Sequence, residues 1–290
     1  MPLNINPSRK PGFMSFGYRP CGIPYRDAVG RLFGHPNLFK RLQAPAIMRA
    51  LDAQPSDRVL DLGCGAGFMT VELAKLTTEA IGVDVNPALR GFRIPLPLAD
   101  RLRYLQTTGE RLPFADDYFD RVLASEVLPM LPDPGDFLKE VARVLKPGGR
   151  LVVPNGTGPL VIEEAYRVRS PRLERLARQY PNRMPKSYEA YCAALQEKFG
   201  TAQRHFFQED EVVALLRQHG FTARSVSYAP RAVAGNWMAW QQFQHHLDPS
   251  RSSAYAQSRG LTFLLSLLSL FDRKDYRGGL IVVAEKALSF

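Results

Sequence analysis

The stretch Val59-Leu60-Asp61-Leu62-Gly63-Cys64-Gly65-Ala66-Gly67 joins an apolar run to three closely spaced glycines. The apolar run predicts a strand, and the helical spacing of residues 68–76 predicts that a helix follows. Glycine has no Cβ atom, so the backbone at these positions can pass very close to a ligand. The N–H groups of such a turn and of the following helix also point to one place. We therefore expect a small-molecule site where this strand ends.

Two classes of nucleotide cofactor bind at turns of this kind. Dinucleotide enzymes favour Gly-x-Gly-x-x-Gly, whose helix end takes a pyrophosphate. Here Gly67 comes one residue too early for that pattern, and Phe68 stands where the third glycine would be. Asp61 adds an anion before the turn, which favours a cationic ligand over a pyrophosphate. The string resembles motif I of the class I S-adenosylmethionine-dependent methyltransferases, whose usual form is V/I-L-D-L/I-G-C-G-x-G.

A second acid lies at the end of the next predicted strand, residues 80–85. Asp84 follows Gly63 by 21 positions. In βαβ cofactor folds, an acid about 20 residues beyond the glycines accepts hydrogen bonds from the ribose hydroxyls. The alternative is that Asp84 only caps the short helix predicted to begin at Asn86-Pro87.

Two later segments extend the resemblance. Residues 107–114, TTGERLPF, are similar to the Gly-Asp-Ala-x-x-Leu-Pro-Phe signature of the type 11-like group, the ubiquinone/menaquinone and sterol-type methyltransferases. In that group the acid of the signature holds the adenine amino group, and Thr108 takes its place here. The strings FDRVLASEVL (119–128) and EVARVLKPGGRLVV (140–153) also look like this group. The resemblance covers residues 58–154.

The resemblance implies that S-adenosylmethionine is the cofactor and that the residues matching these motifs bind it. They are Asp61, Gly63, Cys64, Gly65, Gly67, Asp84, Val85, Thr108, Gly109, Glu110 and Ser125. We expect no metal site, because the three cysteines lie far apart without Cys-x-x-Cys spacing. The same spacing argues against a disulfide framework and for a reducing compartment.

Strand and helix patterns alternate from residue 58 to 154, which predicts a parallel sheet with helices on both faces. After that core, a helix is predicted over 209–219, a sixth strand over 221–228 and a seventh over 279–284. We expect an α/β, Rossmann-like methyltransferase sheet of seven strands, six parallel and the last antiparallel, with a largely helical cap.

The expected organisation alternates between core and cap. It comprises an N-terminal arm or cap (1–44), the S-adenosylmethionine-binding core (45–154), a cap insertion (155–207), a core helix with strand six (208–229), a second cap insertion (230–277) and strand seven (278–290). The core is predicted to open with a helix over 45–51 that has Pro45 at its first position.

Both insertions leave the sheet from the carboxyl ends of strands, where ligands bind in open α/β sheets. An enclosing cap favours a small or slender substrate that is shielded from water. Residues 163–180 predict one arginine-rich helix, which is either a solvated face or a docking face for an anionic group. Residues 261–271 are too short to span a bilayer. They are a buried helix, an interfacial helix or a wall of a lipid-like substrate pocket.

Methyl transfer from a sulfonium is an in-line displacement, for which the protein mainly aligns donor and acceptor and excludes water. An acceptor with a reluctant proton also needs a base. The candidates for that base are His245, His246 and Glu126, although a histidine in a helix is more often structural.

The chain has 38 Lys and Arg against 28 Asp and Glu, so its basic surface allows nucleic acid or an anionic membrane and chooses neither. Residues 125–128 lack the Asn/Asp-Pro-Pro-Tyr/Phe motif of nucleic-acid amino-methylating enzymes. We expect methyl transfer to a small, mainly apolar metabolite that is lipid-, quinone-, polyketide- or terpenoid-like. An RNA methyltransferase and a catalytically silent donor-binding subunit are the alternatives. We expect a cytoplasmic protein, with peripheral membrane contact left open.

Overall fold

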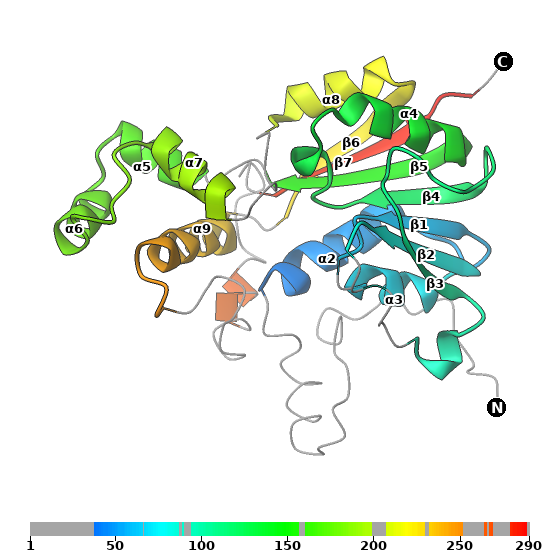
Figure 1. Ribbon diagram of the computed structural model, residues 1–290, viewed down its shortest axis with the longest axis horizontal. Helices are drawn as coiled ribbons and strands as arrows, with labels where there is room; N and C mark the ends of the chain where they lie inside the picture. Colours follow the sequence, from blue (N-terminus) through cyan, green and yellow to red (C-terminus); the bar gives the residue numbers. More distant parts are fainter. Residues whose placement is uncertain are drawn as a thin grey trace.

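The computed structural model contains a seven-stranded sheet with helices on both faces and a further group of helices at one end (Figure 1). The order of the strands is β3-β2-β1-β4-β5-β7-β6. The structure describes residues 38–65, 67–86, 89, 94–156, 160–198, 207–229, 232–251, 264–265, 267–268 and 279–288. The predicted N-terminal arm up to residue 37 lies outside these ranges.

The directions of the strands confirm the predicted arrangement. The strands are β1 (Arg58–Leu62), β2 (Glu79–Asp84), β3 (Leu102–Gln106), β4 (Phe119–Ala124), β5 (Leu145–Gly156), β6 (Phe221–Tyr228) and β7 (Gly279–Lys286). All pairs from β3 to β5 are parallel, whereas β7 runs antiparallel to both β5 and β6. The carboxyl ends of β3, β2, β1, β4 and β5 therefore lie in a row at one edge, as in other parallel sheets.

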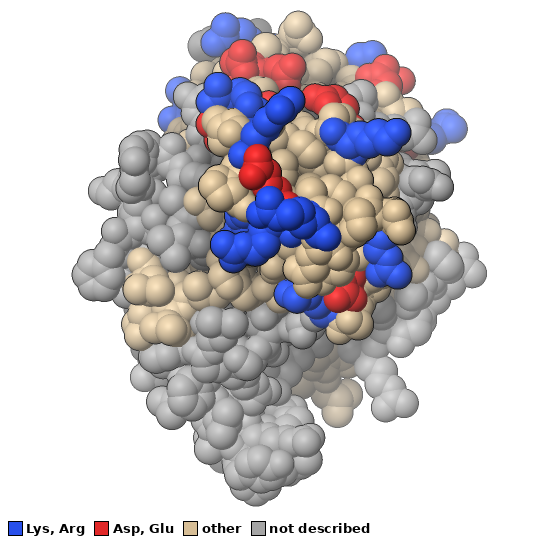
Figure 2. All heavy atoms as spheres, turned by 90° about the vertical axis from the view of Figure 1, so that its left-hand side faces the viewer, with Lys and Arg blue, Asp and Glu red and all other residues tan. Residues whose placement is uncertain are grey.

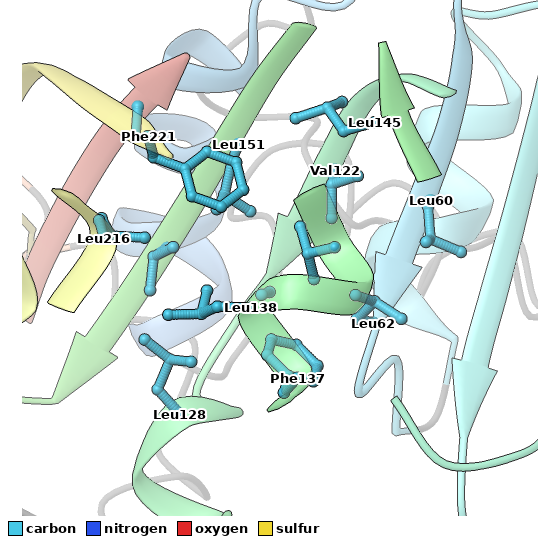
Figure 3. Close-up of a cluster of buried hydrophobic side chains, with 14 of the residues drawn as sticks. Leu60, Leu62, Val122, Leu128, Phe137, Leu138, Leu145, Leu151, Leu216 and Phe221 are labelled. Atoms are coloured by element: carbon cyan, nitrogen blue, oxygen red, sulfur yellow. The ribbon is translucent and has the colours of Figure 1, made fainter. Parts of the chain in front are cut away.

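Two apolar layers enclose the sheet. One face carries α4 (Pro134–Val144) and α8 (Glu209–Gln218), and the other carries α2 (Leu38–Leu51) and α3 (Phe68–Ala74). Side chains alternate along β1, so that Leu60 and Leu62 face α4 while Val59 faces α2. Figure 3 shows the first layer, where Phe137 and Leu138 of α4 lie among the side chains of the central strands. In the described connections lie the short 3-10 helices η2 (Leu96–Leu98) and η3 (Leu128–Met130).

The start of α2 differs from the prediction. The helix begins at Leu38 and carries Pro45 inside it, so the prediction that Pro45 opens this helix was wrong. A proline inside a helix removes one hydrogen bond and crowds the carbonyl group four residues earlier. Ala44, Ile47 and Leu51 are nevertheless fully buried against the sheet. Packing of this apolar face outweighs the local preference of proline.

Strand β5 contains a proline and two glycines near its start. It begins at Leu145, directly after α4, and includes the Lys-Pro-Gly-Gly stretch of residues 146–149. Phe119 of β4 pairs with Leu145, and Arg121 pairs with Arg150, so residues 146–149 form a bulge in the ladder. A bulge accommodates proline and glycine because its residues are not fully paired.

Beyond the carboxyl ends of the parallel strands lies a group of helices that we call the helical lobe (Figure 1). Its members are α5 (Leu160–Arg167), α6 (Pro171–Gln179), α7 (Tyr188–Lys198) and α9 (Ala232–Leu247). The lobe has its own buried cluster, which includes Ile162 of α5, Leu176 of α6, Tyr191 of α7 and Phe243 of α9. It is therefore a packed unit with side chains from all four helices.

The predicted single helix over residues 163–180 was wrong, because α5 and α6 are separate helices. The break lies at residues 168–170. Pro171 occupies the first turn of α6, and the hydroxyl of Ser170 accepts a hydrogen bond from the N–H of Leu173 at 3.3 Å. Serine followed by proline is typical of the start of a helix. The spacing of the arginines over residues 163–180 favoured one continuous helix instead. Basic and acidic side chains are interspersed over this end of the molecule (Figure 2).

Four residues of the apolar segment 261–271 are described. Leu265 is buried against Leu42, Trp237 and Met238. Leu264, Leu267 and Leu268 are exposed by 52%, 37% and 46%. The interpretation as a buried helix was therefore wrong for three of these four residues, whereas the interfacial helix and the wall of a substrate pocket stay predictions. Among the described residues, no helix is both long and apolar enough to cross a membrane.

Candidate functional site

The glycine-rich turn between β1 and α3 lies at the carboxyl end of the central strand. Gly63, Gly65 and Gly67 have φ angles of 67°, 52° and 69°. These angles favour glycine, because a Cβ atom is strained there. The N–H groups of Gly63 and Cys64 donate to the carbonyl oxygen of Val83 at 2.8 and 3.0 Å. The turn is thereby fixed against the end of β2.

The space beside the three glycines differs. A Cβ atom added at Gly63 would collide with Val127, and one at Gly67 would collide with Tyr104. At Gly65, no described atom lies within 4 Å of an added Cβ atom. The backbone of Gly65 is therefore open to the approach of a ligand.

Asp84 ends β2 and faces this turn. Its Oδ2 accepts a hydrogen bond from the N–H of Gly65 at 2.8 Å, and its Oδ1 accepts one from the N–H of Asn86 at 2.9 Å. An ionised carboxylate offers about four acceptor positions, so both oxygens keep capacity for further donors. Asp84 thus accepts from the backbone of Asn86 just after β2 and also from the backbone of the open turn at Gly65. The helix expected at residues 86–87 falls largely outside the described residues.

The segments after β2 and β3 form the next part of this edge. Val85 is 64% exposed, which is unusual for a large apolar side chain directly after a buried strand. Thr108 and Glu110 are exposed in the loop after β3. Gly109 lies so close to the ring of Phe137 that an added Cβ atom would collide with it. The loop after β3 therefore packs directly on α4 through Gly109.

Asp61 lies beneath the glycine turn. It is 1% exposed, and its Oδ2 accepts a hydrogen bond from Oγ1 of Thr70 at 2.6 Å. Burial raises the pKa of Asp61 to about 7, and the charge of Asp84 adds to the increase. Burial also raises the pKa of the Cys64 thiol above its usual range, so this thiol is not an activated nucleophile. Asp61 ties β1 to α3 through Thr70.

The loop after β4 lies beside the glycine turn. It begins with Ser125, which is half-buried. Glu126 has a φ angle of 58°, a strained value for a residue with a side chain. Its N–H donates to the carbonyl oxygen of Pro154 at 2.8 Å, which ties the loop to β5. The side chain of Val127 lies against Gly63.

The structure brings the predicted cofactor residues together and places the two histidines in the helical lobe. The predicted residues lie in or directly after β3, β2, β1 and β4, which are neighbours in the sheet. In contrast, the ring of His246 lies 5.3 Å from that of Tyr191. Nδ1 of His245 lies 2.7 Å from the carbonyl oxygen of Arg251. His246 therefore contacts α7, and His245 contacts the residues that follow α9.

Sequence reasoning missed two residues that shape the site. Tyr104 of β3 donates from its hydroxyl to the carbonyl oxygen of Gly67 at 3.2 Å. Tyr104 pairs with Gly82 of β2. A tyrosine opposite a glycine on the neighbouring strand could have predicted that its ring lies over that glycine. Thr70, the partner of Asp61, gave no such signal, because its position depends on how α3 packs on β1.

Comparison with known proteins places these residues in a wider context. Residues 60–153 match the sequence model of a family described as "Methyltransferase domain". The chain is 32% identical over 203 residues to the 2-phytyl-1,4-naphtoquinone methyltransferase of Synechococcus elongatus, which covers 65% of this chain and 79% of that protein. It is 34% identical over 144 residues to the demethylmenaquinone methyltransferase of Corynebacterium kroppenstedtii. That match covers 47% of this chain and only 59% of the relative.

A solved structure shows the same fold. The S-adenosylmethionine-dependent methyltransferase of Mesorhizobium loti superposes with a TM-score of 0.51 at 16% identity. The superposition covers 83% of this chain and 96% of that protein. At this identity, the likeness concerns the fold alone.

Proposed function

Because the chain belongs to the class I S-adenosylmethionine-dependent methyltransferases, we propose that it transfers a methyl group to the reduced ring of a quinone-like, largely apolar molecule. The observation that carries the donor site is the pairing of Asp84 with the open backbone of Gly65. The two relatives named above are quinone methyltransferases by name, which supports the acceptor class.

The residues present fit this cofactor. The open space at Gly65 admits a ligand against the backbone. Asp84 has acceptor capacity for the ribose hydroxyls, and exposed Val85 offers an apolar surface for the adenine ring. Thr108, with its exposed hydroxyl, takes the place of the acid that holds the adenine amino group in related proteins. Asp61 keeps the turn in position from below.

The cofactor supplies an electrophilic methyl group on a sulfonium sulfur. An oxidised quinone ring is electron-poor, so the acceptor is the reduced, quinol form. One ring carbon forms the new carbon–carbon bond as the carbon–sulfur bond breaks, and the proton of that ring carbon then leaves. The step needs no oxidant or reductant. The chain aligns the two molecules and excludes water, while a base assists the loss of the proton.

Of the three candidate bases, Glu126 has the best support. It follows β4, it lies next to Val127, and Val127 packs on Gly63 of the cofactor turn. Its backbone is strained, and strained residues cluster at active sites. The contacts of His245 and His246 favour a structural role for these side chains.

We also propose that the protein meets its acceptor at a membrane surface. Leu264, Leu267 and Leu268 are exposed, and Leu265 of the same segment packs on Trp237 and Met238 of α9 in the helical lobe. An apolar acceptor partitions into lipid, and exposed leucines insert into the boundary of a bilayer.

The test of the main proposal uses methyl-labelled S-adenosylmethionine with a naphthoquinol that carries one isoprene unit, kept reduced by dithionite. We expect labelled, methylated quinol and a rise in melting temperature with S-adenosylhomocysteine but not with NADH. Stabilisation by S-adenosylhomocysteine without transfer to any quinol would leave the donor site and reject the acceptor class. Stabilisation by NADH alone would reject the donor site.

A further inference from the structure

Two buried carboxamides near the carboxyl end of β5 carry atoms that have no hydrogen-bond partner among the described residues. Asn155 is 0% exposed, and neither its Oδ1 nor its Nδ2 has a partner in the part of the chain that the structure describes. Gln43 of α2 is 1% exposed, and its Oε1 also lacks a partner there. Buried polar atoms are nearly always paired, and leaving one unpaired costs stability. These two side chains therefore need an explanation.

Both carboxamides adjoin the same point of the sheet. Asn155 directly precedes Gly156, which pairs with Gly279 of β7. Nε2 of Gln43 lies 3.2 Å from the position of a Cβ atom added to Gly279. Gln43 comes from the α2 face, whereas Asn155 alternates with Pro154 and shares the opposite face with Val153. The two amides thus flank the last pair of the β5–β7 ladder.

This point lies between the cofactor edge and the apolar side of the lobe. On one side, the N–H of Glu126 donates to the carbonyl oxygen of Pro154, the residue before Asn155. On the other side, Leu42 packs with Trp237 and Met238 of α9 and with Leu265. Figure 1 shows α2 running from the sheet toward α9.

A third amide belongs to the same surroundings. Gln242 lies one helical turn after Met238 on α9, and its Oε1 is buried without a partner among the described residues. The three carboxamides with unpaired atoms therefore lie near a cluster of aromatic and aliphatic side chains. That combination suits a ring that carries oxygens and an apolar tail.

We propose that Asn155 and Gln43 are positioning residues that hydrogen-bond the oxygens of the acceptor ring. A carboxamide both donates and accepts, so it can bind a quinol hydroxyl in either role. The Leu42, Trp237, Met238 and Leu265 cluster then holds the apolar tail. This inference rests on the proposed function, since it assigns the acceptor-binding part of the same site.

The test compares Asn155→Leu and Gln43→Leu with the wild type, using the one-isoprene naphthoquinol as the probe. For each variant we expect KM for the naphthoquinol to rise about ten-fold or more, with a smaller change in kcat. S-adenosylhomocysteine affinity should stay within about two-fold. The melting temperature of Asn155→Leu should be unchanged or higher, because leucine replaces two polar atoms that lack partners, and that of Gln43→Leu should change little, because one unpaired oxygen is removed with the amide. Gln218→Leu, at an exposed position on α8, is the control.

The direction of the stability change separates this role from a structural one. If a variant melts lower and KM is unchanged, the amide is satisfied within the protein and the inference is wrong. Asn155→Ser serves if the leucine variant does not fold, and its hydroxyl should restore part of the affinity for the naphthoquinol. Turnover by the wild type with unchanged KM in both variants rejects the inference alone. No turnover by a wild type that still binds S-adenosylhomocysteine rejects the acceptor class and the inference together.

Discussion

At the scale of the residue, the buried carboxyl of Asp61 makes stability depend on pH. Burial raises its pKa in the folded protein to about 7, well above the value of 3.8 for the unfolded chain. Between these two values the folded state binds more protons than the unfolded state. The free energy of unfolding therefore falls as the pH rises through this window, and it is lowest above pH 7.

The variant Asp61→Asn removes this dependence while keeping an acceptor for the hydroxyl of Thr70. We expect the free energy of unfolding of the variant, minus that of the wild type, to be roughly 2–3 kcal/mol larger at pH 8 than at pH 5. Urea unfolding followed by circular dichroism at both pH values measures the difference. A constant difference between the two proteins would show that Asp61 is ionised throughout.

Asp84 tests the donor site at the same scale. In Asp84→Asn only one oxygen remains to serve the N–H groups of Gly65 and Asn86, and the charge is lost. We expect binding of S-adenosylhomocysteine to weaken by about 1–3 kcal/mol, because hydrogen bonds to charged acceptors are the stronger ones. Isothermal titration calorimetry measures it. The control is Asp100→Asn, at an exposed position before β3, which should bind like the wild type.

The residue scale also shows what the sequence can and cannot predict about a site. The glycine turn and Asp84 were predictable, because their spacing along the chain follows from the strand–turn–helix geometry itself. The partner of Asp61, Thr70, was not predictable in this way. Nor were the unpaired amides of Asn155 and Gln43, since being buried without a partner is a property of the packed molecule.

At the scale of the element, strands were predicted better than helix ends. Strand β6 has the predicted bounds, residues 221–228. Two errors about where helices begin involve proline. Pro45 lies inside a helix whose packing outweighs it, and Pro171 starts a helix where continuous spacing had suggested none. Proline sets a local preference, and only the tertiary contacts decide which outcome it has.

The contact between α6 and α9 gives a prediction at this scale. The guanidinium of Arg172 lies 4.2 Å from the centre of a Trp240 ring, and Arg175 lies one turn further on, exposed. We expect Arg172→Ala to destabilise the lobe by about 0.5–2 kcal/mol through loss of the cation–π contact and of side-chain packing. Arg175→Ala, with the same loss of charge, should change stability by less than about 0.5 kcal/mol.

Tryptophan fluorescence during urea unfolding reports this effect directly. The chain has two tryptophans, Trp237 and Trp240, and both belong to α9. An equal loss of stability in both arginine variants would mean that net charge, and not the stacked contact, governs the lobe.

At the scale of the whole molecule, the positions of the exposed leucines determine which part of the surface can insert into a membrane. Leu264, Leu267 and Leu268 are exposed in the segment whose Leu265 packs on α9 of the lobe. Leu288, exposed by 60%, follows β7, which ends at the opposite edge of the sheet because it runs antiparallel to β5. The chain carries a net charge of +10, which draws it toward anionic lipid from any direction. Of these four described leucines, the three beside α9 would insert next to the proposed acceptor site.

We therefore expect the protein to cosediment with vesicles that contain phosphatidylglycerol, and the double change Leu267→Glu and Leu268→Glu to weaken binding about ten-fold or more. Each inserted leucine contributes roughly 1 kcal/mol or more, and the added carboxylates are repelled by the lipid headgroups. Leu288→Glu changes the charge at one exposed leucine on the far end and should reduce binding far less. Equal effects at both ends would mean that net charge alone attracts the protein to the membrane. Binding that persists at about 0.5 M salt in the wild type but not in the double variant would identify insertion as the second contribution, since salt screens charge and leaves apolar contact intact.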